Sequence, residues 1–229
     1  MFIRILGTGP ADTSRYNTSV LIDDSILIDA GPTVPVQLFS MDILPRYILL
    51  THPHGDHILG LPILMLRLSR SHRPIIYGFR ETIRKARLLW SETYGLVEAE
   101  KIADFRTFEH GDVLQVEGYR VRVLQRPHGP MRTAVFKFDD SMVYATDVRD
   151  VEEDACYYMG VDVLFHEVGE GSYHTPVDEL AKLLSRANPS LTYIIHYDDD
   201  MDEAGVLARL KQYYRGEVRF ARRGMSLVL

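Results

Sequence analysis

Cysteine and long apolar runs are both scarce in this sequence. Its one cysteine, Cys156, cannot form an intramolecular disulfide. A chain without disulfides suits a reducing compartment, so we expect a cytoplasmic protein. No apolar run approaches the roughly 20 residues that a membrane-spanning helix needs, and residues 1–6 lack the apolar core of a signal peptide. We therefore expect no membrane role.

Positive charge is also in short supply. The chain has 26 Lys and Arg against 32 Asp and Glu, a net charge of −6, which argues against broad nonspecific binding of polyanions. The one basic stretch spans residues 67–87, where seven Lys or Arg accompany a single acid, Glu81. Most such stretches are solvated helix faces. Docking of a substrate phosphate is the alternative.

Apolar residues make up 46% of the 229 residues, which is ample for a core. We expect a single domain over residues 1–229, or two tightly fused halves, because no linker or repeat interrupts the sequence. Alternating runs between residues 105 and 144 predict an antiparallel meander that adds a second sheet. Helices are expected over residues 81–94, with Leu88, Leu89 and Trp90 facing inward, and over residues 203–215. Another should begin at Thr175 as N-cap, with Asp178 completing a capping-box-like pair.

Histidine is concentrated in one short stretch. His52, His54 and His57 fall within six residues together with Asp56, directly after the apolar run 47–50. That run has the length and composition of a buried strand, so the cluster begins where a strand ends. Residues two apart, such as His52 and His54, can point to one side, whereas Asp56 and His57 cannot both follow them. The stretch predicts ligands for two neighbouring metal ions; a His-rich polar loop is the plain alternative.

The motif His-x-His-x-Asp-His after an apolar strand resembles the signature of the metallo-β-lactamase superfamily. The longer stretch from Leu50 to Pro62 is similar to the ribonuclease Z branch, as is the glycine-rich turn 6–9. This resemblance implies an α+β chain folded as a four-layer αββα sandwich. It also implies that Asp29, in an Asp-x-Gly segment, supports the metal site without binding metal; a plain turn aspartate is the alternative.

A site for two metals needs more ligands than one loop supplies, and three candidates follow later strand-like runs. His128, Asp147 and His196 lie where the superfamily places its third histidine, its bridging carboxylate and its final histidine. The resemblance implies that Asp147 bridges two ions, one bound by His52, His54 and His128 and the other by Asp56, His57 and His196.

Imidazoles with two carboxylates suit zinc first, with manganese or iron as alternatives, better than calcium or magnesium. Two such cations roughly 3.5 to 4 Å apart would hold a bridging hydroxide that attacks phosphorus. Asp56 could orient that hydroxide as well as bind metal. We therefore expect a metal-dependent hydrolase with two divalent ions.

Two later segments resemble the ribonuclease Z branch in particular. Residues 165–168 (Phe-His-Glu-Val) are similar to its His-Glu-Ala-Thr segment, and residues 173–175 (Tyr-His-Thr) to its His-Ser-Thr segment. The resemblance implies that Glu167 and His174 form a general-acid dyad. A carboxylate beside an imidazole raises the imidazole pKa and fixes its tautomer, as an acid near neutral pH requires. The alternative is that His174 packs structurally at a helix start.

The sequence also departs from that branch. Residues 168–169 are Val-Gly where the family has Ala-Thr, residues 198–200 are all Asp, and residues 12–17 lack the family's basic pattern. The chain is short for ribonuclease Z, and no Gly- or Pro-rich insertion could form the arm that grips tRNA. The chemistry is therefore better supported than the substrate.

The leading functional expectation is a ribonuclease Z-like phosphodiester hydrolase acting on an RNA 3′ end or a small phosphodiester, with His174 as general acid. The alternative is a cyclic-phosphate or cyclic-nucleotide phosphodiesterase, which needs no RNA grip. Thioester or lactam hydrolysis fits less well, because those branches place the third histidine in a Gly-His-Thr setting. A noncatalytic metal-binding module would require a broken ligand set, and all seven positions are intact. The oligomeric state, a homodimer included, stays open.

Overall fold

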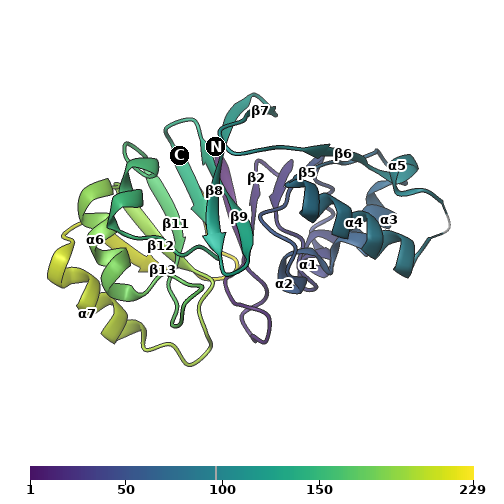
Figure 1. Cartoon of the computed structure of the whole chain (residues 1–229). Coiled ribbons are helices and arrows are strands. Elements are labelled where there is room, and N and C mark those ends of the chain that lie inside the picture. The colour runs from purple at the N-terminus through teal and green to yellow at the C-terminus, as the bar shows by residue number, and fades with distance from the viewer. Residues whose placement is uncertain (96) are drawn as a thin grey trace. The chain divides into compact units, whose positions relative to one another are not determined.

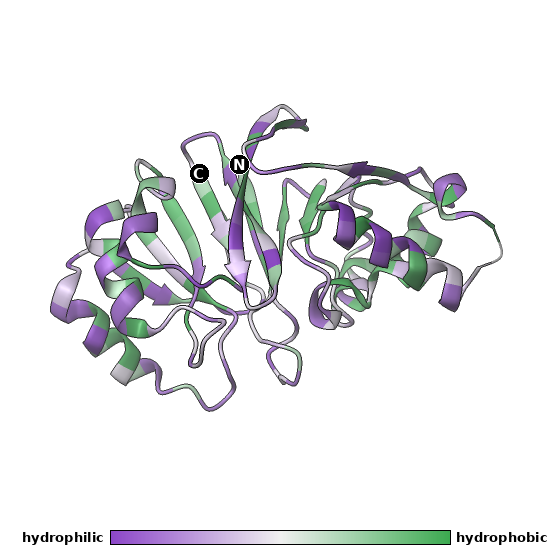
Figure 2. Ribbon diagram, viewed as in Figure 1, coloured by the Kyte–Doolittle hydropathy of each residue, from purple (hydrophilic) through white to green (hydrophobic). Residues whose placement is uncertain are grey.

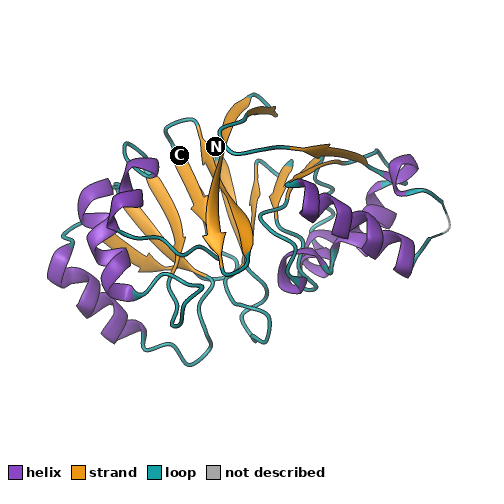
Figure 3. Cartoon of the chain, in the orientation of Figure 1, coloured by secondary structure: helices purple, strands orange, loops and turns teal. Residues whose placement is uncertain are grey.

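The computed structural model describes residues 1–95 and 97–229. The chain divides into two compact units, the first made of Met1–Glu109 and Arg222–Val228 and the second of His110–Ala221 with Leu229. Each unit contains one seven-stranded sheet (Figures 1 and 3). The single domain expected over residues 1–229 stays a prediction.

The sheet of the first unit has the strand order β14-β1-β2-β3-β4-β5-β6. Strands β14, β1, β2 and β3 pair antiparallel, and β3 to β6 pair parallel. The turn between β2 and β3 places Asp23 and Asp24 at positive φ, which aspartate tolerates better than most residues. The strands are β1 (Phe2–Gly7), β2 (Ser19–Ile22), β3 (Ile26–Ile28), β4 (Tyr47–Leu49), β5 (Ile75–Gly78), β6 (Asp104–Thr107) and β14 (Ser226–Val228).

The described residues of this unit form five helices, whose apolar sides pack on residues such as Leu27, Ile48 and Ile76 of the sheet. In α4, Trp90 is buried as expected, but Leu88 is 51% exposed, so its inward placement was wrong. The buried side of α4 carries Ala86 and Trp90, and Leu88 is two residues from each, on the opposite side of the helix. The helices are α1 (Val34–Ser40), α2 (Gly55–Ile58), α3 (Leu61–Leu68), α4 (Arg80–Thr93) and α5 (Ala99–Ile102).

The sheet of the second unit has the order β13-β12-β11-β10-β9-β8-β7. Strands β7 to β10 form the expected antiparallel meander, and β10 to β13 pair parallel. Residues 105–107 do not join the meander: they lie in β6, parallel to β5 in the first sheet, after the helical connection through α4 and α5. The strands are β7 (Val113–Val116), β8 (Tyr119–His128), β9 (Met131–Phe138), β10 (Met142–Ala145), β11 (Val163–Glu167), β12 (Leu191–Ile195) and β13 (Glu217–Phe220).

The helices of the second unit are η1 (Glu152–Tyr157), α6 (Val177–Ala187) and α7 (Glu203–Tyr213). The prediction that Thr175 caps a helix was wrong, because α6 begins at Val177 and Pro176 occupies the N-cap. The Thr175 hydroxyl instead donates to Val148 O (2.9 Å) and accepts from the Asp150 N–H (3.0 Å). The Thr175 hydroxyl, which the sequence predicted to cap α6, is therefore used in contacts with the loop after β10.

Apolar residues concentrate on the strands of each sheet (Figure 2). Within the described part of the chain, no helix is long and apolar enough to cross a membrane. A cytoplasmic location stays a prediction.

Strand direction decides where polar loops gather. In the second sheet β8, β10, β11 and β12 all point the same way, because β8 and β10 flank the antiparallel β9. Their carboxyl ends therefore share one edge, which carries His128, Asp147, Glu167 and His196. In the first sheet the parallel neighbours β3 and β4 likewise end beside each other, at Asp29 and at the histidine-rich loop. Such edges are where α/β proteins build their binding sites.

Candidate metal centre

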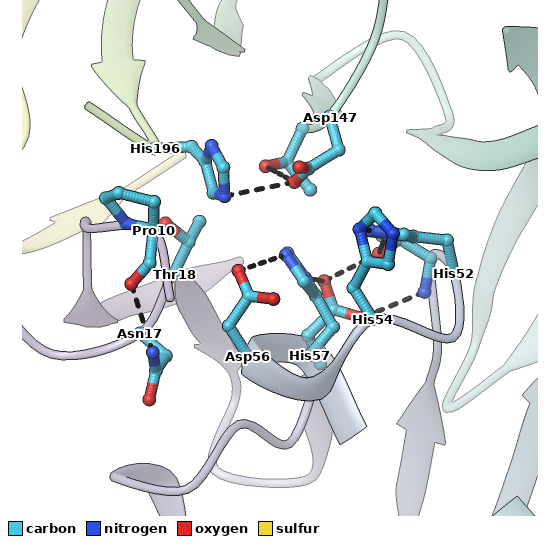
Figure 4. A network of polar contacts seen from close by, with 12 residues as sticks. Pro10, Asn17, Thr18, His52, His54, Asp56, His57, Asp147 and His196 are labelled. Carbon is cyan, nitrogen blue, oxygen red and sulfur yellow. Dashed lines mark hydrogen bonds and ion pairs between the residues drawn. The ribbon is translucent and has the colours of Figure 1, made fainter. Parts of the chain in front are cut away.

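The loop from β4 into α2 carries four of the expected ligands, and it pairs them two by two. His52 Nε2 lies 2.9 Å from His54 Nδ1, and His57 Nε2 lies 3.1 Å from Asp56 Oδ2 (Figure 4). His52 and His57 are fully buried. The His52 and His57 rings are also close, with centres 4.3 Å apart. The assignment of the two pairs to two different metal ions stays a prediction.

The Asp29 carboxylate holds this loop through contacts with Thr51 and His57. Its Oδ2 lies 2.7 Å from His57 Nδ1 and accepts the Thr51 hydroxyl (2.8 Å), and its Oδ1 accepts the Thr51 N–H (2.8 Å). Thr51 Oγ1 in turn lies 3.1 Å from His52 Nδ1. Burial raises the pKa of Asp29, and the neighbouring His57 opposes that rise. These contacts match the supporting role expected of Asp29 and explain its complete burial.

Gly31 allows the loop to sit against the end of β3. A Cβ at this position would overlap the carbonyl oxygen of Asp56, so only glycine permits the approach. The Ala30 N–H donates to His57 O (2.7 Å), and the Gly60 N–H donates to Ala30 O (2.8 Å). The Asp-x-Gly segment thus fixes both the side chain and the backbone of the histidine loop.

The second unit contributes another set, centred on Asp147. Asp147 Oδ2 lies 3.2 Å from His196 Nε2, and Asp147 Oδ1 lies 3.6 Å from His128 Nε2. All three residues are buried. Asp147, two residues after β10, and His196, the residue after β12, both adopt positive φ, a sparsely populated conformation for these residue types. Two oxygens facing two different imidazoles suit a bridging carboxylate.

A carbonyl oxygen holds the remaining ring nitrogen of His128, because His128 Nδ1 lies 3.2 Å from Tyr173 O. His196 Nδ1 lies 3.8 Å from Glu167 Oε2, which is too far for a hydrogen bond. The Thr146 hydroxyl donates to Asp147 Oδ2 (2.9 Å). Holding one nitrogen leaves the other as the metal-facing atom, a common arrangement of metal-binding histidines.

Glu167 and His174, the expected dyad, are in direct contact. Glu167 Oε2 lies 2.6 Å from His174 Nδ1, and Glu167 Oε1 accepts the Val148 N–H (2.6 Å). The hydrogen bond to Glu167 raises the pKa of His174 to about 9, although burial opposes the rise. Burial also raises the pKa of Glu167, and its bond to His174 opposes this. His174 is therefore a cation at neutral pH when no metal is bound.

The donor sets fit a transition metal. Two atoms that bind one tetrahedral zinc at 2.0–2.1 Å lie about 3.3 Å apart. The four donor pairs of the two units span 2.9 to 3.6 Å. In the second unit, atoms of Asp147, His174 and His196 all lie within 4.8 Å of one another, so the expected acid is beside two of the expected ligands. Imidazole with carboxylate suits zinc, manganese or iron; the identity and the number of ions stay predictions.

Sequence reasoning missed a buried polar cluster behind the second set. The Asp150 carboxylate contacts Arg126 Nε (2.5 Å), His166 Nε2 (3.1 Å) and the hydroxyl of Tyr158. Burial would raise the pKa of Asp150, but His166 and Arg126 hold it below its usual range. The cluster ties β8 and β11 to the loop after β10. Arg126 and His166 adjoin motif residues, but no local pattern shows that Asp150 joins them.

The basic stretch lies partly on α4. Arg87 pairs with Glu100 (2.9 Å), and Arg80 and Arg84 are exposed. A solvated helix face accounts for these positions. Phosphate docking there stays a prediction.

Comparisons with known proteins agree on the fold. A structure titled as a new diphosphatase from the PhnP family aligns with a TM-score of 0.79 and 20% identity over 100% of this chain and 97% of that one. The metallo-β-lactamase fold protein YhfI from Bacillus subtilis aligns with a TM-score of 0.82 and 18% identity over 99% and 98%. The expected metallo-β-lactamase sandwich is confirmed.

Proteins of similar sequence indicate which branch of the superfamily the chain resembles. An Anti-Pycsar protein Apyc1 from Paenibacillus sp. (strain J14) is 28% identical over 87% of this chain and 90% of its own length. A UPF0173 metal-dependent hydrolase from Enterococcus faecalis is 25% identical over 79% of each chain. A ribonuclease Z from Nanoarchaeum equitans is 43% identical, but over only 29% of this chain and 24% of its own. The resemblance to the superfamily and its ribonuclease Z-like branch is confirmed, and the chain is a metal-dependent, phosphodiesterase-like hydrolase.

A family model described as Anti-Pycsar protein Apyc1 matches residues 1–226, nearly the whole chain. The chain belongs to the Anti-Pycsar protein Apyc1 family.

Proposed function

We propose that this protein hydrolyses a phosphodiester bond of a cyclic nucleotide, with His174 as general acid. The observation that carries the proposal is the 2.6 Å contact between His174 Nδ1 and the buried carboxylate of Glu167. A protonated imidazole held in one orientation is the group that a poor leaving oxygen requires. A protein that only binds metal would not need a protonated imidazole at this position.

Seven residues make up the proposed ligand set. That they serve one centre with two divalent ions is inferred from the family and from the donor pairs within each unit. The bound ions would supply a hydroxide nucleophile near neutral pH and positive charge that stabilises the transition state. The ligands are His52, His54 and His128 for one ion and Asp56, His57 and His196 for the other, with Asp147 shared.

Glu167 has two effects on the acid. It occupies His174 Nδ1, which leaves Nε2 as the nitrogen that can give a proton to the leaving oxygen. Its charge favours the imidazolium, so the proton is present at neutral pH. Because Glu167 Oε1 also accepts the Val148 N–H, the carboxylate is fixed at both ends. The dyad is therefore preorganised before any substrate arrives.

A small substrate suits the chain better than RNA. The Apyc1 relative matches most of the chain, whereas the ribonuclease Z relative matches 75 residues, and the sequence has no arm for tRNA. Tyr173 is 50% exposed, and its ring centre lies 6.2 Å from that of the ligand His128. An exposed aromatic ring beside a ligand could stack on a base, an interaction worth about 1–3 kcal/mol. These features favour a nucleotide among small phosphodiesters.

Cleavage at an RNA 3′ end, the leading expectation from sequence, becomes the second candidate. The 43% identity to a ribonuclease Z over 75 residues supports the shared metal chemistry. That similarity covers 29% of this chain and 24% of the ribonuclease Z.

The first prediction concerns metal content. Purified protein reconstituted with zinc or manganese should hold close to two ions per chain by elemental analysis. Asp147→Ala should lower the content for both ions, because this carboxylate faces two imidazoles. Asp200→Ala removes an exposed aspartate that is not among the proposed ligands, and it should keep two ions. A wild-type content that stays near one would contradict the two-metal centre.

The second prediction concerns the pKa of His174 in metal-free protein. NMR titration should give a pKa of about 9, and Glu167→Gln should lower it towards the ordinary 6.5. Since the folded pKa is the higher one, the stabilisation from protonated His174 is complete below pH 6.5 and is lost as pH rises through about 9. Thermal unfolding should show this loss in wild type and less of it in Glu167→Gln. An unchanged pKa in the variant would show that Glu167 is not its cause.

The third prediction separates substrates by leaving group. A sugar hydroxylate needs a proton to depart, whereas nitrophenolate can leave without one. His174→Ala should keep its metals yet lose at least about a hundredfold in rate on a cyclic nucleotide, with a much smaller loss on a nitrophenyl phosphodiester. Glu167→Gln should show the same selectivity in milder form. Equal losses on both substrates, or loss of metal, would make His174 a structural or ligand residue.

A further inference from the structure

The second unit has a cavity of about 410 Å³ that contains none of the proposed ligands or the dyad. Its walls come from β7, β8, β9 and η1. Its size falls within the range of small-molecule sites. The charged lining consists of three long cationic side chains, Arg120, Arg122 and Lys137, and two carboxylates, Asp139 and Asp140. His110, Cys156 and Tyr157 also line the cavity.

The sheet register brings these cations together. Arg122 on β8 lies directly opposite Lys137 on β9, and Arg120 is two residues from Arg122 on the same face. Like charges directly opposite each other across a strand pair destabilise a sheet. The lining therefore carries three cations against two carboxylates, an excess of positive charge in a chain whose net charge is −6. A bound anion would relieve the repulsion.

A third arginine on the same face of β8 provides an internal comparison. Arg126 is buried, and its guanidinium is neutralised by Asp150 and Asp154. Among the described residues, no ion pair joins Arg120 or Arg122 to a carboxylate, although Asp139 and Asp140 line the same cavity. Lys137 contacts Met159 O (3.0 Å) and the exposed Asp140 (3.6 Å). Arg126 is thus neutralised by two carboxylates, whereas the guanidinium groups of Arg120 and Arg122 are available to a ligand.

Arg120 and Arg122 each offer the planar set of donors that fits a phosphate. Tyr157, half-buried in η1, adds an aromatic surface, and the His110 ring is oriented by the Gln125 N–H, which donates to its Nδ1 (3.0 Å). We propose that this cavity binds a phosphate monoester of nucleotide size, at a site separate from the metal centre. The phosphate contacts Arg120, Arg122 and Lys137, and the aromatic part lies toward Tyr157.

The only cysteine of the chain makes this occupancy measurable. Cys156 is exposed and lines the cavity, so a bound ligand shields its thiol from a neutral reagent such as iodoacetamide. The assay uses the full chain with its metals removed by chelation, so that phosphate binding at the metal centre does not contribute. Adenosine 5′-monophosphate is the probe, and inorganic phosphate at the same concentration is the comparison.

In wild type, alkylation of Cys156 should slow at least about fivefold, with saturation, as the probe is added, and calorimetry should give the same dissociation constant. Arg120→Gln with Arg122→Gln should weaken the probe at least about tenfold, the scale of one or two charge-assisted hydrogen bonds. Arg70→Gln with Arg215→Gln removes the same charge from exposed positions outside the cavity and should bind like wild type. Neither double variant should unfold below the wild-type temperature, since all four side chains are exposed. The variant at Arg120 and Arg122 could unfold slightly above it, because the repulsion between Arg122 and Lys137 is removed.

Three results would overturn the proposal. One is alkylation that the probe does not slow at any concentration up to about 10 mM, the weak end of specific binding. Another is an equal loss of binding in the two double variants, which would show only general charge attraction. Equal protection by inorganic phosphate would contradict the assignment to a ligand of nucleotide size.

Discussion

The site depends on a simple constraint: an imidazole can direct one nitrogen at a metal only if its other nitrogen is held. The protein meets this need with oxygens from outside the ligand set. Asp29 lies beside His57 Nδ1, Thr51 beside His52 Nδ1, and the Tyr173 carbonyl beside His128 Nδ1. Each contact fixes a tautomer and a ring orientation before metal arrives. Glu167 likewise holds His174 Nδ1, but in this case the imidazole keeps a proton that it can donate.

This arrangement places charge and strain where a stable core would avoid them. Asp29, Asp147 and Glu167 are buried carboxylates, and Asp29, Asp147 and His196 take positive φ. Conformations of this kind cost about 1–3 kcal/mol each and persist where the surrounding structure over-determines them. Here the surrounding structure is the carboxyl edge of parallel strands, with Gly31 and the Asp150 cluster behind the loops. A role in the proposed site accounts for these features better than stability does.

Much of this site was predictable from sequence because its parts are local. The spacing of His52, His54, Asp56 and His57 after a strand predicts their pairing, and family resemblance assigned Glu167 to His174. Long-range contacts were not predictable. Thr175 looks like a helix cap, yet its hydroxyl binds Val148 and Asp150, and β6 joins the first sheet because a distant strand, β5, accepts it. The role of Asp150 depends on three partners from three elements, which no local pattern contains.

Substrate choice is the central claim, and a competition assay tests it most directly. Metal-loaded protein would receive a 3′,5′-cyclic nucleotide and a precursor tRNA in one reaction, each followed by its own product. The account predicts that a linear nucleotide monophosphate forms, that chelation stops its formation, and that the tRNA stays intact over the same turnovers. Cleavage of the tRNA at its 3′ end with the cyclic nucleotide unchanged would contradict it.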